Sequence, residues 1–313
     1  MLNEYGLKLI RIDLPFRLNH VNCFLAEGEN GYTVIDAGLH DEQTVKRWDD
    51  ELVGKEITDL IITHYHPDHF GYAGGFQQKY GARVSMSKVD AENGILAWNA
   101  DFLSDLEKNY HTSGIPETMS REMIENTREF IPRVTPYPTI DQYLEEGKKI
   151  VIGKLEYEII FTPGHSEGLV TFYNKEKNVL IGTDHILPKI TPNISHWFHG
   201  DPNPLASFYR SLDKIASLEV DFIIPSHGKP FHDGHARVLE LKEHHEERLE
   251  ILLDIIKKEH TIFEACEKLF NKKLNVHESR FAIGETLAHL EYLRLAGRCT
   301  RELKDDIYVY QAE

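Results

Sequence analysis

The chain has 313 residues, 41% of them hydrophobic, which is enough for one large domain or a large domain with a small one. Its 35 Lys and Arg against 51 Asp and Glu give a formal charge of −16, which repels polyanions and argues against nucleic acid as a partner. Three distant cysteines exclude a disulfide framework, and no stretch reaches the roughly 18 apolar residues of a membrane span. We therefore expect a cytoplasmic protein without membrane contact.

Strands and helices alternate in the first part of the chain. The run GYTVIDAG at 31–38 predicts a buried strand and a turn, and the helical spacing of Val45, Trp48 and Leu52 predicts a helix over 41–53. A β-branched strand, ITDLIITHYH, follows, then a helix near 72–80 and the strand ARVSMS. This alternation is typical of an α/β protein.

The alternation stops between about residues 88 and 145, which we interpret as a helical insertion. Helices are expected around 91–110 and 117–130, and Trp98 and Phe102 make the insertion either a lid or an ordinary packed helix pair. Strands then return in KIVIG, LEYEIIF, LVTFYN and NVLIG, followed by a helix over 204–218 and the apolar run DFIIP.

Composition changes again after about residue 231. A long charged helix with one apolar stripe is followed by helices at 261–270 and about 278–296 and by a tail that can form a hairpin. These elements resemble a winged-helix module, so we predict a catalytic domain over 1–230 and a C-terminal domain over 231–313. The last helix has no Lys/Arg stripe, which favours packing or homodimer formation over binding to nucleic acid.

Four apolar runs end in side chains that bind metals. These endings are THYHPDH, TPGH, GTDH and PSHG. Because the carboxyl ends of neighbouring strands meet at one rim of a sheet, we expect these side chains to converge there. His64 and His66 are two residues apart and therefore face the same side of an extended segment. Imidazole and carboxylate ligands suit zinc best and also admit iron or manganese.

The segment THYHPDH matches the HxHxDH signature, and the chain resembles the metallo-β-lactamase superfamily over about residues 20–230. The resemblance implies an α/β fold with a four-layer αββα sandwich and two divalent metal ions. It assigns His64, His66 and His165 to the first metal, Asp68, His69 and His227 to the second, and Asp184 to a bridge. Asp36 in VIDAG is implied to fix the histidine loop without touching metal. The set is closer to glyoxalase II and RNase Z than to the secreted β-lactamases, which use a cysteine ligand.

The resemblance predicts a hydrolase in which a hydroxide shared by two metals attacks a small ester, thioester or lactone. Asp68 is the expected catalytic residue that steers the proton of the attacking water. Two divalent ions less two aspartates and one hydroxide leave a charge near +1, so the substrate is expected to be an anionic small molecule. The alternatives are a phosphodiesterase or RNA endonuclease, and a non-hydrolytic one-iron enzyme similar to persulfide dioxygenases.

Other polar residues lie near the expected ligands in the sequence. Tyr65, His196 and His199 are candidates for contact with substrate, and His185 is a weaker one. Taken singly, each is better explained as an ordinary hydrogen-bonded residue. The Pro- and Asn-rich stretch after Asp184 predicts a loop beside the pocket.

Overall fold

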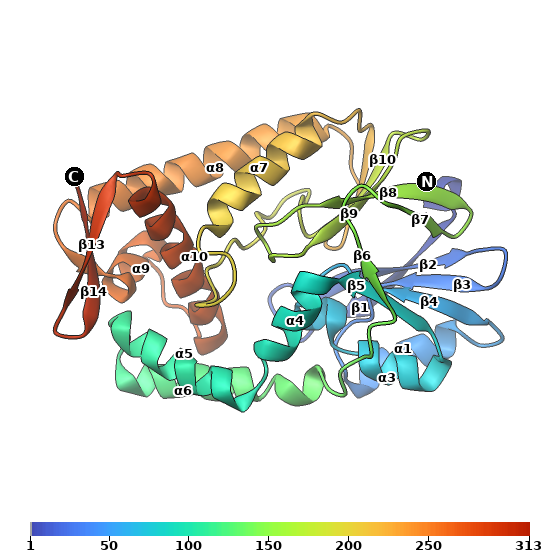
Figure 1. Ribbon diagram of the computed structural model, residues 1–313, viewed down its shortest axis with the longest axis horizontal. Coiled ribbons are helices and arrows are strands. Elements are labelled where there is room, and N and C mark those ends of the chain that lie inside the picture. Colours follow the sequence, from blue (N-terminus) through green and yellow to red (C-terminus); the bar gives the residue numbers. More distant parts are fainter. Residues whose placement is uncertain (1) are drawn as a thin grey trace.

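The computed structural model describes residues 2–313. Two β-sheets lie face to face and helices cover their outer faces, so the core of the molecule has the predicted αββα layers (Figure 1). A second group of helices and a small sheet, formed by the end of the chain, lies beside this sandwich. The site is built where the two sheets end.

The first sheet has six strands in chain order, mixed in direction. They are β1 (Leu7–Asp13), β2 (His20–Glu27), β3 (Tyr32–Ile35), β4 (Ile57–Ile61), β5 (Arg83–Ser87) and β6 (Gln142–Leu144). The pairs from β1 to β3 are antiparallel and those from β3 to β6 are parallel. The sequence analysis missed β1 and β2. β1 mixes buried residues with the exposed, charged Lys8, Arg11 and Asp13 and lacks a continuous apolar run, whereas β2 is a continuous buried run that was not assigned.

The second sheet has five strands in the order β11-β10-β9-β8-β7. They are β7 (Lys149–Ile152), β8 (Leu155–Phe161), β9 (Val170–Asn174), β10 (Val179–Thr183) and β11 (Phe222–Pro225). Only the β10–β11 pair is parallel. Phe24 and Ile35 from the first sheet and Tyr157 and Phe172 from the second fill the space between the sheets. Burial of such side chains contributes most of the free energy that holds the two sheets together.

Helices close the outer face of each sheet. α1 (Glu42–Glu51) and α3 (Ala73–Tyr80) cover the first sheet, where Trp48 and Phe76 meet edge to face with ring centroids 5.5 Å apart. α7 (Pro204–Ala216) covers the second sheet and begins at Asn203, whose side chain accepts a hydrogen bond from the Ala206 amide. A single helical turn, α2 (Pro67–Phe70), lies within the histidine segment.

The helical insertion differs in two ways from the prediction. The expected single helix over 91–110 is two helices, α4 (Lys88–Leu96) and α5 (Ala100–Thr112), because the Asn99 side chain caps a new helix by accepting from the Phe102 amide at 2.8 Å. α6 (Glu117–Arg128) and a 3₁₀ turn, η2 (Ile131–Arg133), follow. The insertion also ends earlier than residue 145, since β6 joins the first sheet beside β5 with Gln142 opposite Ser85.

The C-terminal part contains the predicted helices and tail hairpin. Its elements are α8 (Gly234–Ile255), β12 (His260–Thr261), α9 (Ile262–Phe270), α10 (Val276–Leu295), β13 (Cys299–Lys304) and β14 (Ile307–Ala312). The short β12 was not predicted; it extends the hairpin to a sheet of order β12-β14-β13. The likeness to a winged helix rests on this element order alone and stays a prediction.

One hydrophobic cluster runs from the insertion into the C-terminal part. Leu106 of α5, Phe208 of α7, Leu249 of α8 and Leu287 of α10 belong to the same buried cluster. The predicted boundary near residue 230 falls between β11 and α8, but the core continues across it. Within residues 2–313, no helix combines the length and the apolar character needed to span a bilayer.

Candidate metal centre

The predicted ligands all lie in segments that follow strands of the two sheets. The segment from His64 to His69 follows β4 and enters α2, with Pro67 at its first position. His165 follows β8, Asp184 follows β10 and His227 follows β11. These segments meet at one rim of the sandwich, as the strand-end argument predicts.

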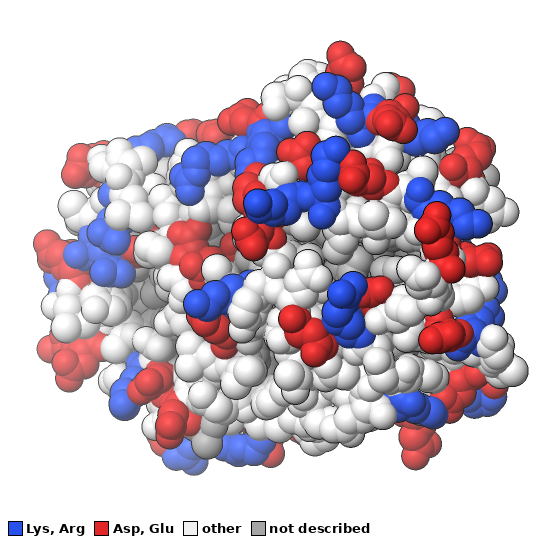
Figure 2. Space-filling model, turned by 45° about the vertical axis from the view of Figure 1, so that its right-hand side comes forward, with Lys and Arg blue, Asp and Glu red and all other residues white. Residues whose placement is uncertain are grey.

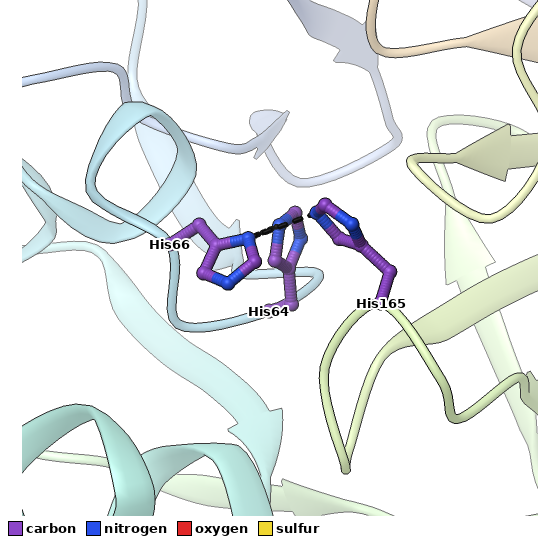
Figure 3. Close-up of side chains that lie close together, drawn as sticks. All are labelled: His64, His66 and His165. Atoms are coloured by element: carbon purple, nitrogen blue, oxygen red, sulfur yellow. Dashed lines mark hydrogen bonds between the residues drawn. The ribbon is translucent and has the colours of Figure 1, made fainter. Parts of the chain in front are cut away.

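Three imidazoles face one another at the first position (Figure 3). His66 Nδ1 lies 3.1 Å from His64 Nε2 and 2.9 Å from His165 Nε2. The three side chains come from two separate loops, and the ring nitrogens point to a common centre. Three ring nitrogens in this arrangement suit a metal ion such as zinc, which binds its ligands in a tetrahedron.

A second group lies beside the first. His227 Nε2 and His69 Nε2 lie 3.5 Å and 3.6 Å from Asp68 Oδ2. Asp184 connects the two groups: its Oδ2 is 3.3 Å from both His165 Nε2 and His227 Nε2, and its Oδ1 is 3.5 Å from His69 Nε2. The structure thus brings together all seven predicted ligands, with Asp184 between the two triads.

Hydrogen bonds on the outer side of the rings decide which nitrogens are free to bind a metal. Three carbonyl or carboxylate oxygens accept from Nδ1: Asn193 O from His165 at 2.8 Å, His20 O from His227 at 2.6 Å, and Asp36 Oδ2 from His69 at 2.7 Å. A neutral imidazole that donates through Nδ1 carries its lone pair on Nε2. In the neutral ring, the form that binds a metal, each of these Nε2 atoms points a lone pair into the centre.

His64 reaches the same state through a hydroxyl group. The Thr63 hydroxyl donates to Asp36 Oδ2 at 2.9 Å, so it accepts from His64 Nδ1 at 3.0 Å and leaves Nε2 unprotonated. Asp36 also accepts from the Thr63 amide at 2.9 Å. Asp36 thus fixes two of the histidines without pointing at the centre, which is the position that the resemblance implied for it.

The charges around the centre favour a cation. Burial, together with the charge of neighbouring His69, lowers the pKa of His64 well below its usual value. Burial works in the same direction at His69, but the carboxylates of Asp184, Asp68 and Asp36 outweigh it and hold its pKa well above the usual range. Burial would raise the pKa of Asp184, yet His227 and His69 keep it well below its usual range. The carboxylates therefore stabilise a positive charge at the centre.

The donor set fits two divalent metal ions. Among the buried polar atoms that lack a hydrogen-bond partner are His69 Nε2, His227 Nε2 and Asp184 Oδ1, and all three face the centre. Leaving such atoms buried and unpaired is costly unless a ligand satisfies them. Imidazoles and carboxylates with this outer support form sites for zinc, iron or manganese.

Asp90 is a residue of the site that sequence reasoning missed. Its carboxylate accepts from the Tyr65 amide at 3.2 Å, the Ser166 hydroxyl at 2.6 Å and the Gly168 amide at 2.5 Å. It thereby connects the His64–His66 loop to the His165 loop from the first turn of α4. Burial raises its pKa to about 6 despite these three donors. The only feature of the local sequence near Asp90 is Ser87, whose side chain caps α4 by accepting from the Asp90 amide. The contacts of Asp90 with residues far along the chain leave no pattern in the sequence.

A pocket opens beside His165. Its lining includes two of the proposed substrate contacts, Tyr65 and His199, together with Asn93, Glu167 and Trp197. His196 lies outside this lining, since its amide donates to Gly284 O at 2.9 Å and its ring accepts from the Phe198 amide. His185 is fully buried, with its ring 5.3 Å from that of Phe208. Tyr65 and His199 are therefore the two proposed contacts that reach the pocket.

Comparisons with known proteins agree with this architecture. A family model described as metallo-beta-lactamase superfamily matches residues 17–227, and one described as metallo-beta-lactamase-like, C-terminal domain, matches residues 249–313. A metallo-beta-lactamase family protein of Thermus thermophilus is 33% identical, with 99% of each chain covered and a TM-score of 0.87.

Several curated relatives carry hydrolase names. The probable metallo-hydrolase YqjP of Bacillus subtilis is 23% identical over 91% of both chains. The hydroxyacylglutathione hydrolase GloC of Haemophilus influenzae is 25% identical over 67% of this chain and 86% of that protein. Since the family model spans most of the sandwich and the His and Asp clusters able to hold metal lie at its rim, this chain belongs to the metallo-beta-lactamase superfamily and is a hydrolase of that family.

Proposed function

We propose that the protein is a two-metal hydrolase that cleaves a small ester, thioester or lactone. The observation that carries the proposal is the set of four imidazoles whose outer nitrogens are engaged, so that their inner nitrogens face Asp68 and Asp184 at one point. The first triad and the second triad are both complete, which favours two ions over one. This completeness also argues against the alternative of a one-iron enzyme similar to persulfide dioxygenases.

The residues around the centre would have distinct roles in hydrolysis. Two divalent ions bound here would supply Lewis acidity for activating water and polarising a carbonyl oxygen. His64, His66 and His165 would hold the first ion and Asp68, His69 and His227 the second, with Asp184 between the two groups. Asp68 is the ligand with the more exposed carboxylate, at 18% against 7% for Asp184, so it is placed to receive a proton from water and return it to the leaving group.

The residues that line the pocket suit the acyl end of a small substrate. Tyr65 and Trp197 give it aromatic walls, and His165 connects it directly to the first triad. Two divalent ions against the two carboxylates of Asp68 and Asp184 leave the centre positive, which favours an anionic substrate. The relative named hydroxyacylglutathione hydrolase adds support for a thioester. Zinc is the metal we expect, because imidazole dominates the ligand set.

The competing candidate is a phosphodiesterase or RNA endonuclease of the same superfamily. On the face shown in Figure 2, Lys and Arg alternate with Asp and Glu and form no continuous basic surface. A nuclease needs cations along a phosphate backbone, and the formal charge of −16 opposes this. These observations favour the small-molecule substrate.

Activity profiling of metal-loaded protein tests the proposal. The panel contains thioesters, esters, lactones, phosphodiesters and single-stranded RNA, and each activity is repeated with Asp184→Ala to exclude contaminants. That variant should lose about a thousandfold or more in rate, because the centre loses the carboxylate between its triads. We expect the best substrate to be an acyl compound whose kcat/KM changes only a few-fold with salt. RNA cleavage that depends on Asp184 and falls steeply with salt would replace this proposal with the nuclease.

A further inference from the structure

The segment 193–196 connects the metal centre to the C-terminal part of the chain. On one side, the backbone carbonyl of Asn193 accepts from His165 Nδ1 at 2.8 Å. This bond keeps His165 Nε2 unprotonated and directed at the centre, 3.3 Å from Asp184 Oδ2. The orientation of a proposed ligand therefore depends on where this segment lies.

The side chain of the same residue faces the other way, toward α10. Asn193 Nδ2 donates to Glu285 Oε2 at 3.2 Å, and Asn193 Oδ1 accepts from the Ser195 hydroxyl at 2.5 Å. Glu285 lies on α10 with 14% of its side chain exposed. Its other carboxylate oxygen, Oε1, forms an ion pair with Arg248 of α8, whose Nε lies 3.4 Å away. One residue thus joins His165 to two helices of the C-terminal part.

Backbone contacts fix the segment at the neighbouring turn of α10. The His196 amide donates to Gly284 O at 2.9 Å, and the Ser195 hydroxyl reaches Phe281 O at 3.3 Å. A Cβ atom at Gly284 would lie 2.9 Å from both Cβ and Oγ of Ser195, so the close approach requires glycine. In Figure 1, α10 accordingly runs inward from the β13–β14 hairpin to meet the loop that precedes α7.

We infer that Glu285 is a positioning residue of the metal centre and that the C-terminal part is a structural component of the active site. Glu285 binds Asn193, and Asn193 orients His165. Ser195 of the same segment and Trp197 directly after it line the pocket. The inference rests on the proposed metal site and adds to it a distant carboxylate that tunes metal binding. It also gives the C-terminal part a role other than binding a partner.

Glu291 provides a matched control on the same helix. Its buried carboxylate is bound by Arg294, Arg301 and Tyr310, all of which belong to the C-terminal part. Its influence on the 193–196 segment is electrostatic, through the ring of His196, whereas Glu285 is hydrogen-bonded to Asn193. Glu285→Ala and Glu291→Ala should both lower thermal stability. A residue that serves only the fold of the C-terminal part should act like Glu291.

The experiment measures Zn²⁺ affinity of the full-length chain by competition with a chromophoric chelator. Glu285→Ala should weaken binding by about 10–100-fold, the usual effect of losing a residue that orients a ligand. Glu285→Gln, which keeps an oxygen for Asn193 Nδ2, should remain within about threefold of the wild type, and so should Glu291→Ala. Asn193→Ala combined with Glu285→Ala should be no worse than either change alone, because both break the same connection.

Two failures are distinguishable. If the wild-type chain binds no Zn²⁺, the proposed metal site itself is wrong. If the wild type binds Zn²⁺ but Glu285→Ala and Glu291→Ala bind it equally well, or lose it equally, the positioning role of Glu285 is overturned while the metal site stands. Additive losses in the double variant would overturn it as well.

Discussion

Four of the five histidines of the centre are oriented by a hydrogen bond at the ring nitrogen that faces away from it. The partners on the outer side are of three kinds: backbone carbonyls for His165 and His227, a carboxylate for His69, and a hydroxyl for His64. Because these bonds select one tautomer in advance, the ligands need little reorganisation when a metal binds. Asp36 serves two of these histidines at once and is the natural residue to test.

Asp36→Ala should weaken Zn²⁺ binding by about 10–100-fold, since His69 and Thr63 lose the acceptor that orients them. It should also lower the free energy of unfolding by about 1–3 kcal/mol through buried donors left unpaired. Chelator competition and chemical denaturation measure the two effects. Asp50→Ala, which removes an exposed carboxylate paired with Lys46, should change neither by much. Unchanged metal affinity in Asp36→Ala would show that the outer hydrogen bonds are dispensable.

The buried pair His245 and His289 predicts how stability depends on pH. Burial, with the His289 ring as the next cause, lowers the pKa of His245 to about 2, and burial lowers that of His289 to about 4. In the unfolded chain both take up protons near pH 6.5. The unfolded state thus binds more protons below that pH, and stability falls as the pH drops from about 6.5 toward 4.

His245→Asn tests this because the asparagine amide can still donate to His289 Nε2 in place of His245 Nδ1, 3.0 Å away, but does not titrate. The slope of unfolding free energy against pH should fall by about 1.4 kcal/mol per pH unit between pH 6 and 4. His235→Asn, on the exposed side of the same helix, should keep the wild-type slope. Equal slopes in both variants would show that His245 is charged in the folded protein.

At the scale of elements, the sequence predicts strands by their apolar runs and the site by the residues that end them. The helices α1, α3, α7, α9 and α10 lie close to their predicted ranges, and all seven ligands converge as the strand-end argument requires. Such predictions succeed because periodicity and strand-end placement are local properties. β1 was not predicted because three of its seven side chains, Lys8, Arg11 and Asp13, are charged and exposed and interrupt the apolar run.

Contacts between segments far apart in the chain could not be predicted from the sequence. Asp90, Asn193 and Glu285 act through hydrogen bonds to residues far along the chain, and ordinary helix or loop patterns surround each of them. The break at Asn99 was missed because a capping residue inside a helical pattern competes with the helix only when the tertiary fold requires a bend. The sequence alone therefore predicts the ligands of the site but not Asp90, Asn193 and Glu285, which support them.

The shared core predicts the cost of changes in α8. Leu249 is fully buried in the cluster that joins α8 to α7 and α10, whereas Leu239 of the same helix is 56% exposed. Leu249→Ala should lower the free energy of unfolding by about 2–5 kcal/mol, and Leu239→Ala by about 0.5 kcal/mol or less. Denaturation followed by fluorescence measures both. Equal small effects would mean that α8 contributes little to the core.

For the whole molecule, the cluster that runs from α5 through α7 into α8–α10 makes the C-terminal part integral to the fold. Division at about residue 230 remains a proposal about how the chain is organised, not a boundary at which the core ends. Two sets of contacts therefore hold the metal centre in place. One is formed by the strand ends of the sandwich, and the other by the 193–196 segment bound to α10.

The most direct test of the account is the number of divalent metals per chain and how activity follows it. Protein prepared without chelator, or metal-free protein titrated with Zn²⁺, should reach close to two ions per chain by elemental analysis, because two complete triads and a carboxylate between them are present. Hydrolysis of the best acyl substrate should become maximal only as the second ion binds. Full activity with one ion or none would contradict the two-metal hydrolase.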